Sequence, residues 1–471
     1  MATTITRKST TQFFNNEVKE YATYVVHTRA LPNIMDGLRI GARKILYASI
    51  KNKKLNPANF DKRSKIKMVH LIGETMNMEF NHGDVSLKNT IEQLASKHYN
   101  KQSPLYVIGQ IGTLRDPKIN TAARYLKVIS TKYLQLYTDH KELWDYSIED
   151  GNKVQPNFFL PLIPISLLYR TNAPGFGFSY RSFSYDIDDL INAVLSVLIN
   201  DSCTGLNHVE IKPVIDGIKQ SNIIYNSNIN NYYNVGEYVL TAKNQILITD
   251  LPYTQYFDKY NSYLFDLKEK GIILDYQNET NKGNIAFRIT FPIGRMEQLI
   301  KTKLKFFKLL RLYQKVPDDK LNLIDTNRKS IVYFTNRNEL VEAFVKRRLN
   351  FYDDFKQLKI KDLKSEIREL ETKLKFLQLI IDEKVIINKR TKSNIVEQFK
   401  QHGLIKRDVL ENLKLSISRL TKDEMDKTQE KLDGLYDLLK YYQETSIREL
   451  YIRDLIDFKQ KFGENKITKI N

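Results

Sequence analysis

The stretch YATYVVHTRALPNIMDGLRIGARKILY, residues 21–47, opens the part of the chain whose pattern decides the fold. From Gly37 to about His98, apolar residues recur at helical spacing in three separate segments. Residues 56–65 and 79–84, between these segments, are rich in Pro, Asn, Gly and charged residues, which favours loops. Three short helices in succession predict a helix-turn-helix type domain. Their apolar faces are expected to hold Leu38, Ala42, Ile45 and Leu46, then Ile66, Val69, Ile72 and Met76, then Leu87, Ile91 and Leu94.

Beyond this domain the sequence changes character twice. Short β-rich pieces at residues 105–108 and 125–130, and alternating strand and turn signals from about residue 154 to 291, predict an α/β region. From residue 338 onward Gly and Pro nearly vanish, and two charged helical runs with a helical knob between them predict an antiparallel coiled coil. A plain helical bundle is the alternative. The seam of the first run is Leu363, Ile367, Leu370, Leu374, Leu377 and Ile381. The expected α+β multidomain chain therefore divides into residues 1–150, 151–337 and 338–471.

The charge balance points to a polyanionic partner. The chain holds 74 Lys and Arg against 55 Asp and Glu, a formal net charge of +19. Lys-rich coding bias is the alternative source of this charge, because Asn and Ile are also heavily used.

A single cysteine, Cys203, excludes an intramolecular disulfide and a Cys-rich zinc site, and it favours a reducing compartment. The first residues, MATTITRKSTTQFF, lack the apolar stretch of a signal peptide. The most apolar run, residues 158–169, is short and contains two prolines. We therefore expect no membrane span and a cytoplasmic location.

Four collinear blocks resemble the breakage-reunion region that the gyrase A subunit shares with eukaryotic topoisomerase II, the type IIA DNA topoisomerases. They are the stretch at 21–47, KMVHLIGETM at 67–76, NHGDVSLKNTI at 81–91, and IGQIGT at 108–113 with AARYLKV at 122–128. PLIPISLLYRTNAPGFGFSY at 161–180 and NELVEAFVKRRLNFY at 338–352 extend the resemblance over nearly the whole chain. It implies a winged-helix DNA-gate domain, an α/β tower domain, and a long antiparallel coiled coil that ends in a helical C-gate.

The resemblance implies that Tyr125 is the nucleophile that attacks a DNA phosphodiester. A phenol with a pKa near about 10 is a poor nucleophile at neutral pH, so it needs cationic or hydrogen-bonding groups nearby. By the family match, Arg124 and Arg43 clamp the phosphate, and His82 hydrogen-bonds it or assists proton transfer. The alternatives are an ordinary phosphate anchor at Arg124, a helix-capping histidine at His82, and a solvated helix face at Arg43 and Lys44.

Other residues are expected to bind DNA without reading its sequence. The basic side chains on or around the helix-turn-helix can neutralise backbone phosphates; they are Arg29, Arg39, Arg43, Lys44, Lys65 and Lys67. Ile163 matches the family's apolar wedge, which inserts between base pairs and bends the duplex. A core isoleucine is the alternative for Ile163.

The absence of two motifs shapes the expected assembly. We find neither the acidic toprim pattern that holds divalent metal nor a Gly-rich ATP lid in this sequence, so no metal site is assigned to it. Mg²⁺ and ATP are expected on a partner subunit that carries toprim and ATPase domains, in an A2B2-type heteromer with a homodimer of this chain. The motifs, with Ala42 and a single histidine at 82, are most similar to the medium subunit of T-even-type bacteriophage topoisomerases.

Two other functions fit parts of the pattern. A non-enzymatic, dimeric DNA-organising protein would bind duplex DNA with a steep salt dependence but would form no covalent adduct. A tyrosine recombinase or replication initiator would also use a tyrosine nucleophile. Recombinases, however, place that tyrosine near the C-terminus, whereas Tyr125 precedes the long coiled coil.

Overall fold

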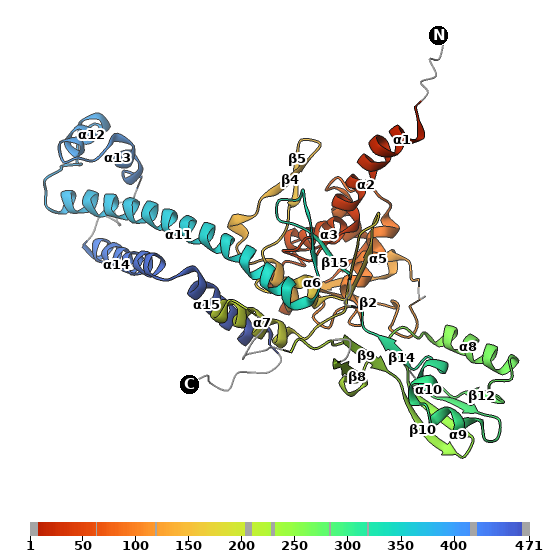
Figure 1. Ribbon diagram of the computed structural model, residues 1–471. Coiled ribbons are helices and arrows are strands. Elements are labelled where there is room, and N and C mark those ends of the chain that lie inside the picture. The colour runs from red at the N-terminus through yellow and green to blue at the C-terminus, as the bar shows by residue number, and fades with distance from the viewer. Residues whose placement is uncertain are drawn as a thin grey trace, which may run out of the picture. The chain divides into compact units, whose positions relative to one another are not determined.

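The computed structural model describes residues 8–62, 64–117, 120–202, 210–227, 231–281, 284–317, 320–414 and 422–463, and Cys203 lies outside them. The fold is mixed α/β, and the chain separates into two compact units (Figure 1). Leu349–Arg453 form the second unit, and the rest of the described chain forms the first. The boundary falls inside helix α11 (Arg337–Ile381), beyond residue 338 where the sequence changes composition. No helix in these ranges combines the length and the apolar content needed to cross a membrane.

The three helices expected after Gly37 are present as α3 (Ile40–Lys51), α4 (Met68–Met76) and α5 (Asp84–Ala95). A helical arm precedes them, made of α1 (Thr10–Phe13), η1 (Phe14–Val18), α2 (Lys19–Val25) and η2 (Val26–Ala30). The expected apolar face of α4 is partly wrong, because Val69 and Met76 are exposed. The helix instead buries Met68, Leu71, Ile72 and Thr75, a set with the same spacing that is shifted by one residue.

A three-stranded antiparallel sheet follows the helices in the order β1-β3-β2, with β1 at Ile66–Lys67, β3 at Lys127–Ser130 and β2 at Leu105–Ile108. The 3₁₀ helix η4 (Ala123–Tyr125) leads directly into β3. Other short helices in this region are η3 (Pro57–Lys62), η5 (Lys132–Tyr137) and η6 (Lys141–Leu143). Val107 and Val128 face each other across the sheet and are buried, so one face of the sheet joins the core while the other meets solvent.

Four further sheets complete the first unit. The hairpin of β4 (Tyr146–Glu149) and β5 (Asn152–Pro156) stands alone. A second sheet has the order β16 (Ile331–Phe334), β15 (Lys320–Ile324), β7 (Ser179–Ser182) and β6 (Thr171–Pro174). A third has the order β14 (Tyr313–Lys315), β9 (Asn231–Val235) and β8 (Ile223–Asn226). Helices α6 (Ile165–Leu168) and α7 (Ile187–Asn200) and the short η7 (Gln220–Asn222) connect these strands.

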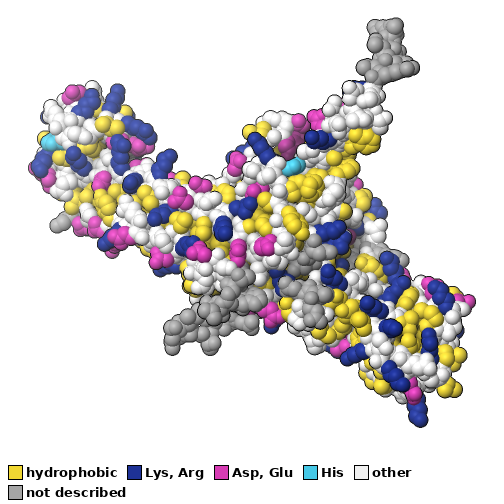
Figure 2. All heavy atoms as spheres, viewed as in Figure 1, with side chains coloured by type: hydrophobic (Ala, Val, Ile, Leu, Met, Phe, Trp, Pro, Cys, Tyr) yellow, Lys and Arg dark blue, Asp and Glu magenta, His cyan; other side chains and the backbone are white. Residues whose placement is uncertain are grey.

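The fourth of these sheets has its own core and lies at one end of the first unit (Figure 1). Its order is β10 (Glu237–Ala242), β11 (Gln245–Asp250), β13 (Phe287–Thr290) and β12 (Asp275–Asn278). Helices α8 (Phe257–Glu269), α9 (Arg295–Ile300) and α10 (Lys303–Leu309) contribute apolar side chains to that core. In Figure 2 most of the charged side chains at this end of the unit are basic, whereas the surface of α11 and α14 carries both signs.

The second unit consists of helices that pair in antiparallel fashion. Ion pairs join α11 to α14 (Lys422–Glu444), with Lys373 to Glu424 at 2.7 Å and Glu366 to Lys431 at 2.8 Å. Residue numbers therefore rise along one helix as they fall along the other. Helices α12 (Lys392–Gln401) and α13 (Lys406–Asn412) form a knob with a separate apolar core. The chain then enters α15 (Ile447–Phe462).

A polar cluster lies in the first unit where α11 begins. The Arg348 guanidinium is fully buried and donates to the carbonyl oxygens of Pro161 and Leu160, both at 3.1 Å. Its Nη2 lies 2.9 Å from Nδ1 of His140, whose Nε2 is 3.7 Å from Asp454 of α15. Nearby, Oδ2 of Asp139 is shielded from solvent and accepts no hydrogen bond among the described residues. Burial raises the pKa of Asp139 to about 7, although Arg348 opposes this shift.

We expect Asp139→Asn to change how stability depends on pH. The aspartate has an ordinary pKa of 3.8, so between pH 4 and pH 7 the folded protein binds the extra proton and loses stability as pH rises. The advantage of the variant over the wild type should therefore grow across this window by on the order of 3 kcal/mol in urea unfolding. Burial lowers the pKa of His140 and gives the opposite slope, which cancels in the comparison. A stability difference between variant and wild type that is the same at pH 4 and pH 7 would contradict this prediction. Asp266→Asn, at an exposed aspartate, is the control.

Candidate DNA-cleavage site

Tyr125 sits at the end of η4 with 67% of its surface exposed. The next residue, Leu126, is fully buried, and its carbonyl oxygen accepts a 2.9 Å hydrogen bond from the backbone N–H of Met68 at the start of α4. Gly109 packs against Leu126: a Cβ there would lie 2.5 Å from the end of the Leu126 side chain, and its φ of +128° favours glycine. The tyrosine ring thus projects into solvent directly before a residue that is anchored in the core.

Basic residues lie next to Tyr125 along the chain and in the adjoining sheet. The Arg124 guanidinium lies 5.0 Å from the ring centroid. Lys67 and Lys127 are directly opposed across β1 and β3, and both are exposed. Opposed like charges repel each other in a sheet, and a bound anion removes this cost. Lys65, which comes directly before β1, is also exposed. We call Lys67, Arg124, Tyr125 and Lys127 the tyrosine surface.

A second basic group borders a separate cavity of about 850 Å³, which we call the histidine cavity. His82 lies there in the exposed loop before α5, with its ring edge-to-face with Phe80 at 5.4 Å. The Arg29 guanidinium lies over the Tyr24 ring at 5.1 Å and is exposed. Arg39 precedes α3, and burial lowers its pKa. Tyr125 and Arg124 do not line this cavity, so the structure divides the expected site residues into two groups.

Arg43 has a different role from the expected phosphate clamp. It is 5% exposed, and its Nε and Nη2 donate to the two carboxylate oxygens of Asp36 at 2.6 and 2.9 Å. Nη2 also donates to the Leu38 carbonyl oxygen at 2.9 Å. Asp36 is fully buried and accepts from the backbone N–H of Phe159 at 3.1 Å. The guanidinium is therefore committed to a buried ion pair and is not presented to DNA, which corrects the expectation for Arg43.

The expected DNA contact of Lys44 is also not supported. This lysine is 2% exposed, its Nζ donates to Oε2 of Glu149 at 2.9 Å, and it hydrogen-bonds the Met78 carbonyl oxygen. It borders the histidine cavity but is almost fully buried. Neither the DNA-contact expectation nor the alternative of a solvated charged face describes these two residues, because both are drawn inward by acidic partners that sequence spacing does not reveal.

Ile163 belongs to the core, which corrects the expected wedge. It is 0% exposed and is followed by the buried α6. The same segment does present apolar side chains to solvent, at the turn between β6 and β7. Phe176 is 52% exposed and Phe178 is 43% exposed, and the Phe176 ring meets the Tyr21 ring of the arm edge-to-face at 6.2 Å. The sequence signal that was missed is an aromatic pair set between glycines in a hairpin turn, GFGF at residues 175–178.

Metal-ligating side chains do not gather near the tyrosine surface. Within the described ranges, no three His, Cys, Asp or Glu side chains converge in a way that could hold a metal ion. The residues near Tyr125 are basic rather than acidic, so they do not suit a divalent cation, and we assign no step of the chemistry to one.

Comparisons with known proteins show which family the chain resembles. The family model for the A subunit of DNA gyrase/topoisomerase IV matches residues 29–459. The mitochondrial DNA topoisomerase 2 of Dictyostelium discoideum is 27% identical over 466 residues, which cover 95% of this chain and 35% of the relative. The DNA topoisomerase medium subunit of Enterobacteria phage T4 is 23% identical over 452 residues, covering 94% of this chain and 97% of the relative. The chain thus spans about a third of the first relative and nearly all of the phage protein.

A solved structure also shares the fold. The DNA-binding, cleavage and re-ligation domain of Plasmodium falciparum topoisomerase II matches with a TM-score of 0.77 at 23% identity. The match covers 95% of this chain and 64% of that one.

The Asp36–Arg43 pair can be tested by stability. Arg43→Gln should lower the free energy of unfolding by on the order of 3 kcal/mol, because it leaves the buried Asp36 carboxylate without its cation. Urea unfolding measures this change. Lys67→Gln, on the exposed tyrosine surface, should change it by less than about 0.5 kcal/mol and should weaken DNA binding instead. If Arg43→Gln keeps wild-type stability and weakens DNA binding as Lys67→Gln does, Arg43 contacts a DNA phosphate as the sequence predicts.

Proposed function

Because the chain belongs to the family of DNA gyrase/topoisomerase IV A subunits, we propose that it is the DNA-breaking and rejoining subunit of a type IIA topoisomerase. In this proposal it makes a transient double-strand break, holds the ends covalently while another duplex passes, and reseals them. Relaxation and decatenation follow from that cycle. The observation that carries the proposal is the exposed Tyr125, which precedes the core residue Leu126 and lies next to the basic residues Arg124, Lys67 and Lys127.

The proposed chemistry is a reversible transesterification. The phenolic oxygen of Tyr125 attacks a backbone phosphorus and forms a 5′-phosphotyrosyl link, while the 3′ oxygen leaves and takes up a proton. The reverse attack by the 3′ hydroxyl restores the DNA and frees the tyrosine. One phosphodiester is exchanged for another, so the bond energy is kept for resealing. Arg124 is proposed to bind the phosphate oxygens as negative charge develops, and His82 to hydrogen-bond the phosphate or assist proton transfer.

DNA binding is proposed to use the basic residues that remain exposed or partly exposed. Arg29, Arg39, Lys65 and Lys67 offer charge without carboxylate partners in the described part of the chain, which suits backbone phosphates and gives broad specificity. Phe176 replaces Ile163 as the proposed apolar wedge, because an exposed aromatic at a hairpin tip can enter a base step and a buried isoleucine cannot.

The proposed architecture and assembly follow the family. We interpret α3 to α5 with the β1-β3-β2 sheet as a winged helix, the sheets after it as the tower, and α11 to α14 as the coiled coil with its C-gate knob. A double-strand break needs two tyrosines, which supports a homodimer. Mg²⁺ and ATP are proposed to reside on a partner subunit with toprim and ATPase domains. We place the protein on DNA in the cytoplasm, in a host cell if a bacteriophage encodes it.

The nucleophile is tested by a covalent-adduct assay. The chain is mixed with a toprim/ATPase partner, Mg²⁺ and end-labelled duplex, and quenched with denaturant. We expect protein linked to DNA 5′ ends for the wild type and none for Tyr125→Phe, with DNA binding retained. Tyr106→Phe, exposed on the same sheet, should still form the adduct. An adduct that survives Tyr125→Phe moves the nucleophile elsewhere, and no adduct from the wild type favours a DNA-organising protein.

The wedge is tested by comparing Phe176→Ala with Ile163→Ala. Phe176→Ala should leave thermal stability nearly unchanged and reduce DNA bending, measured by energy transfer between dyes at the two duplex ends. Ile163→Ala should instead cost about 2–5 kcal/mol in unfolding free energy, because it opens a cavity in the core. Loss of bending in a fully stable Ile163→Ala protein would restore the original assignment.

A further inference from the structure

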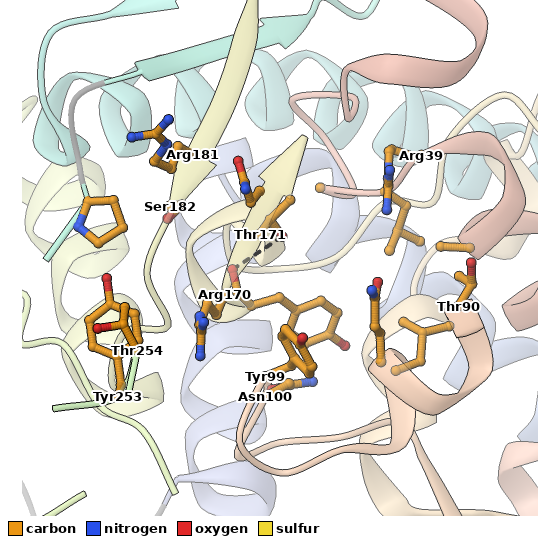
Figure 3. Close-up of a pocket in the computed structure, with 18 of the residues that line it drawn as sticks. Arg39, Thr90, Tyr99, Asn100, Arg170, Thr171, Arg181, Ser182, Tyr253 and Thr254 are labelled. Atoms are coloured by element: carbon orange, nitrogen blue, oxygen red, sulfur yellow. Dashed lines mark hydrogen bonds between the residues drawn. The ribbon is translucent and has the colours of Figure 1, made fainter. Parts of the chain in front are cut away.

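A second cavity in the first unit, of about 600 Å³, is not explained by the chemistry at Tyr125 (Figure 3). Its lining comes from the start of α3, the end of α5, strands β6 and β7, and β14. Four basic residues border it, namely Arg39, Arg170, Arg181 and Lys315, and its lining contains no aspartate or glutamate. We call it the arginine cavity. Its walls therefore carry a concentrated positive charge without internal compensation.

The three arginines also lack partners outside the lining. Within the described part of the chain, no carboxylate lies within ion-pair distance of Arg39, Arg170 or Arg181, and each is only partly exposed. Arg115 is an arginine whose charge is neutralised within the fold: its guanidinium binds Asp250 at 3.0 Å and donates to three backbone carbonyl oxygens. Withdrawing a cation from water without a counter-charge costs free energy. Three partly buried arginines without carboxylate partners therefore do not stabilise the fold, and a bound anion explains their position better.

Arg170 is held in a fixed orientation. Its guanidinium lies over the Tyr253 ring at 4.7 Å and the Tyr99 ring at 5.4 Å, and its backbone N–H donates to the Tyr99 carbonyl oxygen at 2.9 Å. Contacts with ring faces leave the N–H edges of a planar guanidinium free to bind oxygen atoms. Figure 3 shows Arg170 beside the two tyrosines, with Arg181 and Arg39 on other walls of the cavity.

Backbone groups add to this positive potential. Arg39 is the N-cap of the twelve-residue helix α3, and no side chain caps its first turn. The first N–H groups of a helix and its dipole favour an anion at that end. The buried Asn100 also borders the cavity, and its amide nitrogen makes no hydrogen bond of normal geometry, although its side chain lies beside the Tyr169 hydroxyl. Donors from four separate segments therefore face one space.

We propose that the arginine cavity binds a phosphate group at a site distinct from the tyrosine surface. Tetrahedral oxyanions accept paired N–H bonds from guanidinium edges, and three arginines on different walls can contact several oxygens together. The phosphate belongs either to the backbone of a bound duplex, in which case the inference rests on the proposed function, or to a small molecule that carries phosphate. The volume exceeds that of one phosphate, so it admits the sugar or base attached to it.

The test compares a double variant, Arg170→Gln with Arg181→Gln, with Arg295→Gln. Arg295 is an exposed arginine in α9 that lies outside the cavity lining, so its variant measures the effect of removing charge alone. One arm measures duplex binding by fluorescence anisotropy over a range of salt concentrations. The double variant should lose at least about tenfold in affinity and about two units of salt slope, against about one unit or less for the control.

The other arm uses inorganic pyrophosphate and the thermal unfolding midpoint. A rise in the wild-type midpoint that the double variant loses and Arg295→Gln keeps, with unchanged duplex binding, assigns the cavity to a small phosphate compound. Loss of duplex affinity assigns it to the DNA backbone. If the double variant matches Arg295→Gln in both arms, the inference is overturned.

Two further measurements complete the test. Arg170→Lys keeps the charge but loses the planar stacking on the tyrosine rings, so its affinity should fall between those of the wild type and the double variant. It replaces the double variant if circular dichroism shows that the double variant is unfolded. The covalent adduct at Tyr125 should still form in the double variant at saturating DNA. Absence of any adduct from the wild type would refute the proposed function. The pyrophosphate measurement would then be the test of phosphate binding in the cavity.

Discussion

The fully buried carboxylate of Asp36 is the constraint on which the arrangement of the first unit depends. It accepts two hydrogen bonds from Arg43 and one each from the backbone N–H groups of Leu38 and Phe159. A single side chain thus joins the start of α3 to a segment more than a hundred residues later. Gly37 completes the junction, because its φ of +65° is left-handed and a Cβ there would lie 2.4 Å from the backbone nitrogen of Ser166. Neither residue has an obvious substitute.

This junction also determines where positive charge meets solvent. Arg39 follows it directly and borders both the histidine cavity and the arginine cavity. The two cavities share lining residues of α3 and α5, namely Ala42, Thr90 and Gln93. Backbone bonds from Ile34 to Ile324 and from Asn33 to Leu38 hold the loop before Arg39 against β15. A change at Asp36 is therefore expected to disturb both cavities together, although neither cavity contains Asp36.

The sequence predicted local structure well and the surroundings of charged residues poorly. The helices α3, α4 and α5 and strand β2 follow from periodicity, because a helix or strand must place its apolar residues on one side. Periodicity could not show that Arg43 and Lys44 turn inward, since the partner of Lys44, Glu149, lies 105 residues away. The same limit applies to Ile163, whose burial depends on distant segments. The family motif predicts Tyr125 as the nucleophile, and the structure adds that this tyrosine is exposed and directly precedes a core residue.

The net charge of +19 is distributed in a way that separates structural from binding roles. Arg43, Arg115 and Arg347 each meet a carboxylate that is itself partly or fully buried, and these pairs fix contacts between segments. Arg39, Arg170 and Arg181 meet none in the described ranges, although they are also partly withdrawn from water. A coding bias toward basic residues would add charge to exposed surfaces without regard to position. It does not explain why unpaired arginines from separate segments converge on one cavity, whereas a phosphate-bearing ligand does.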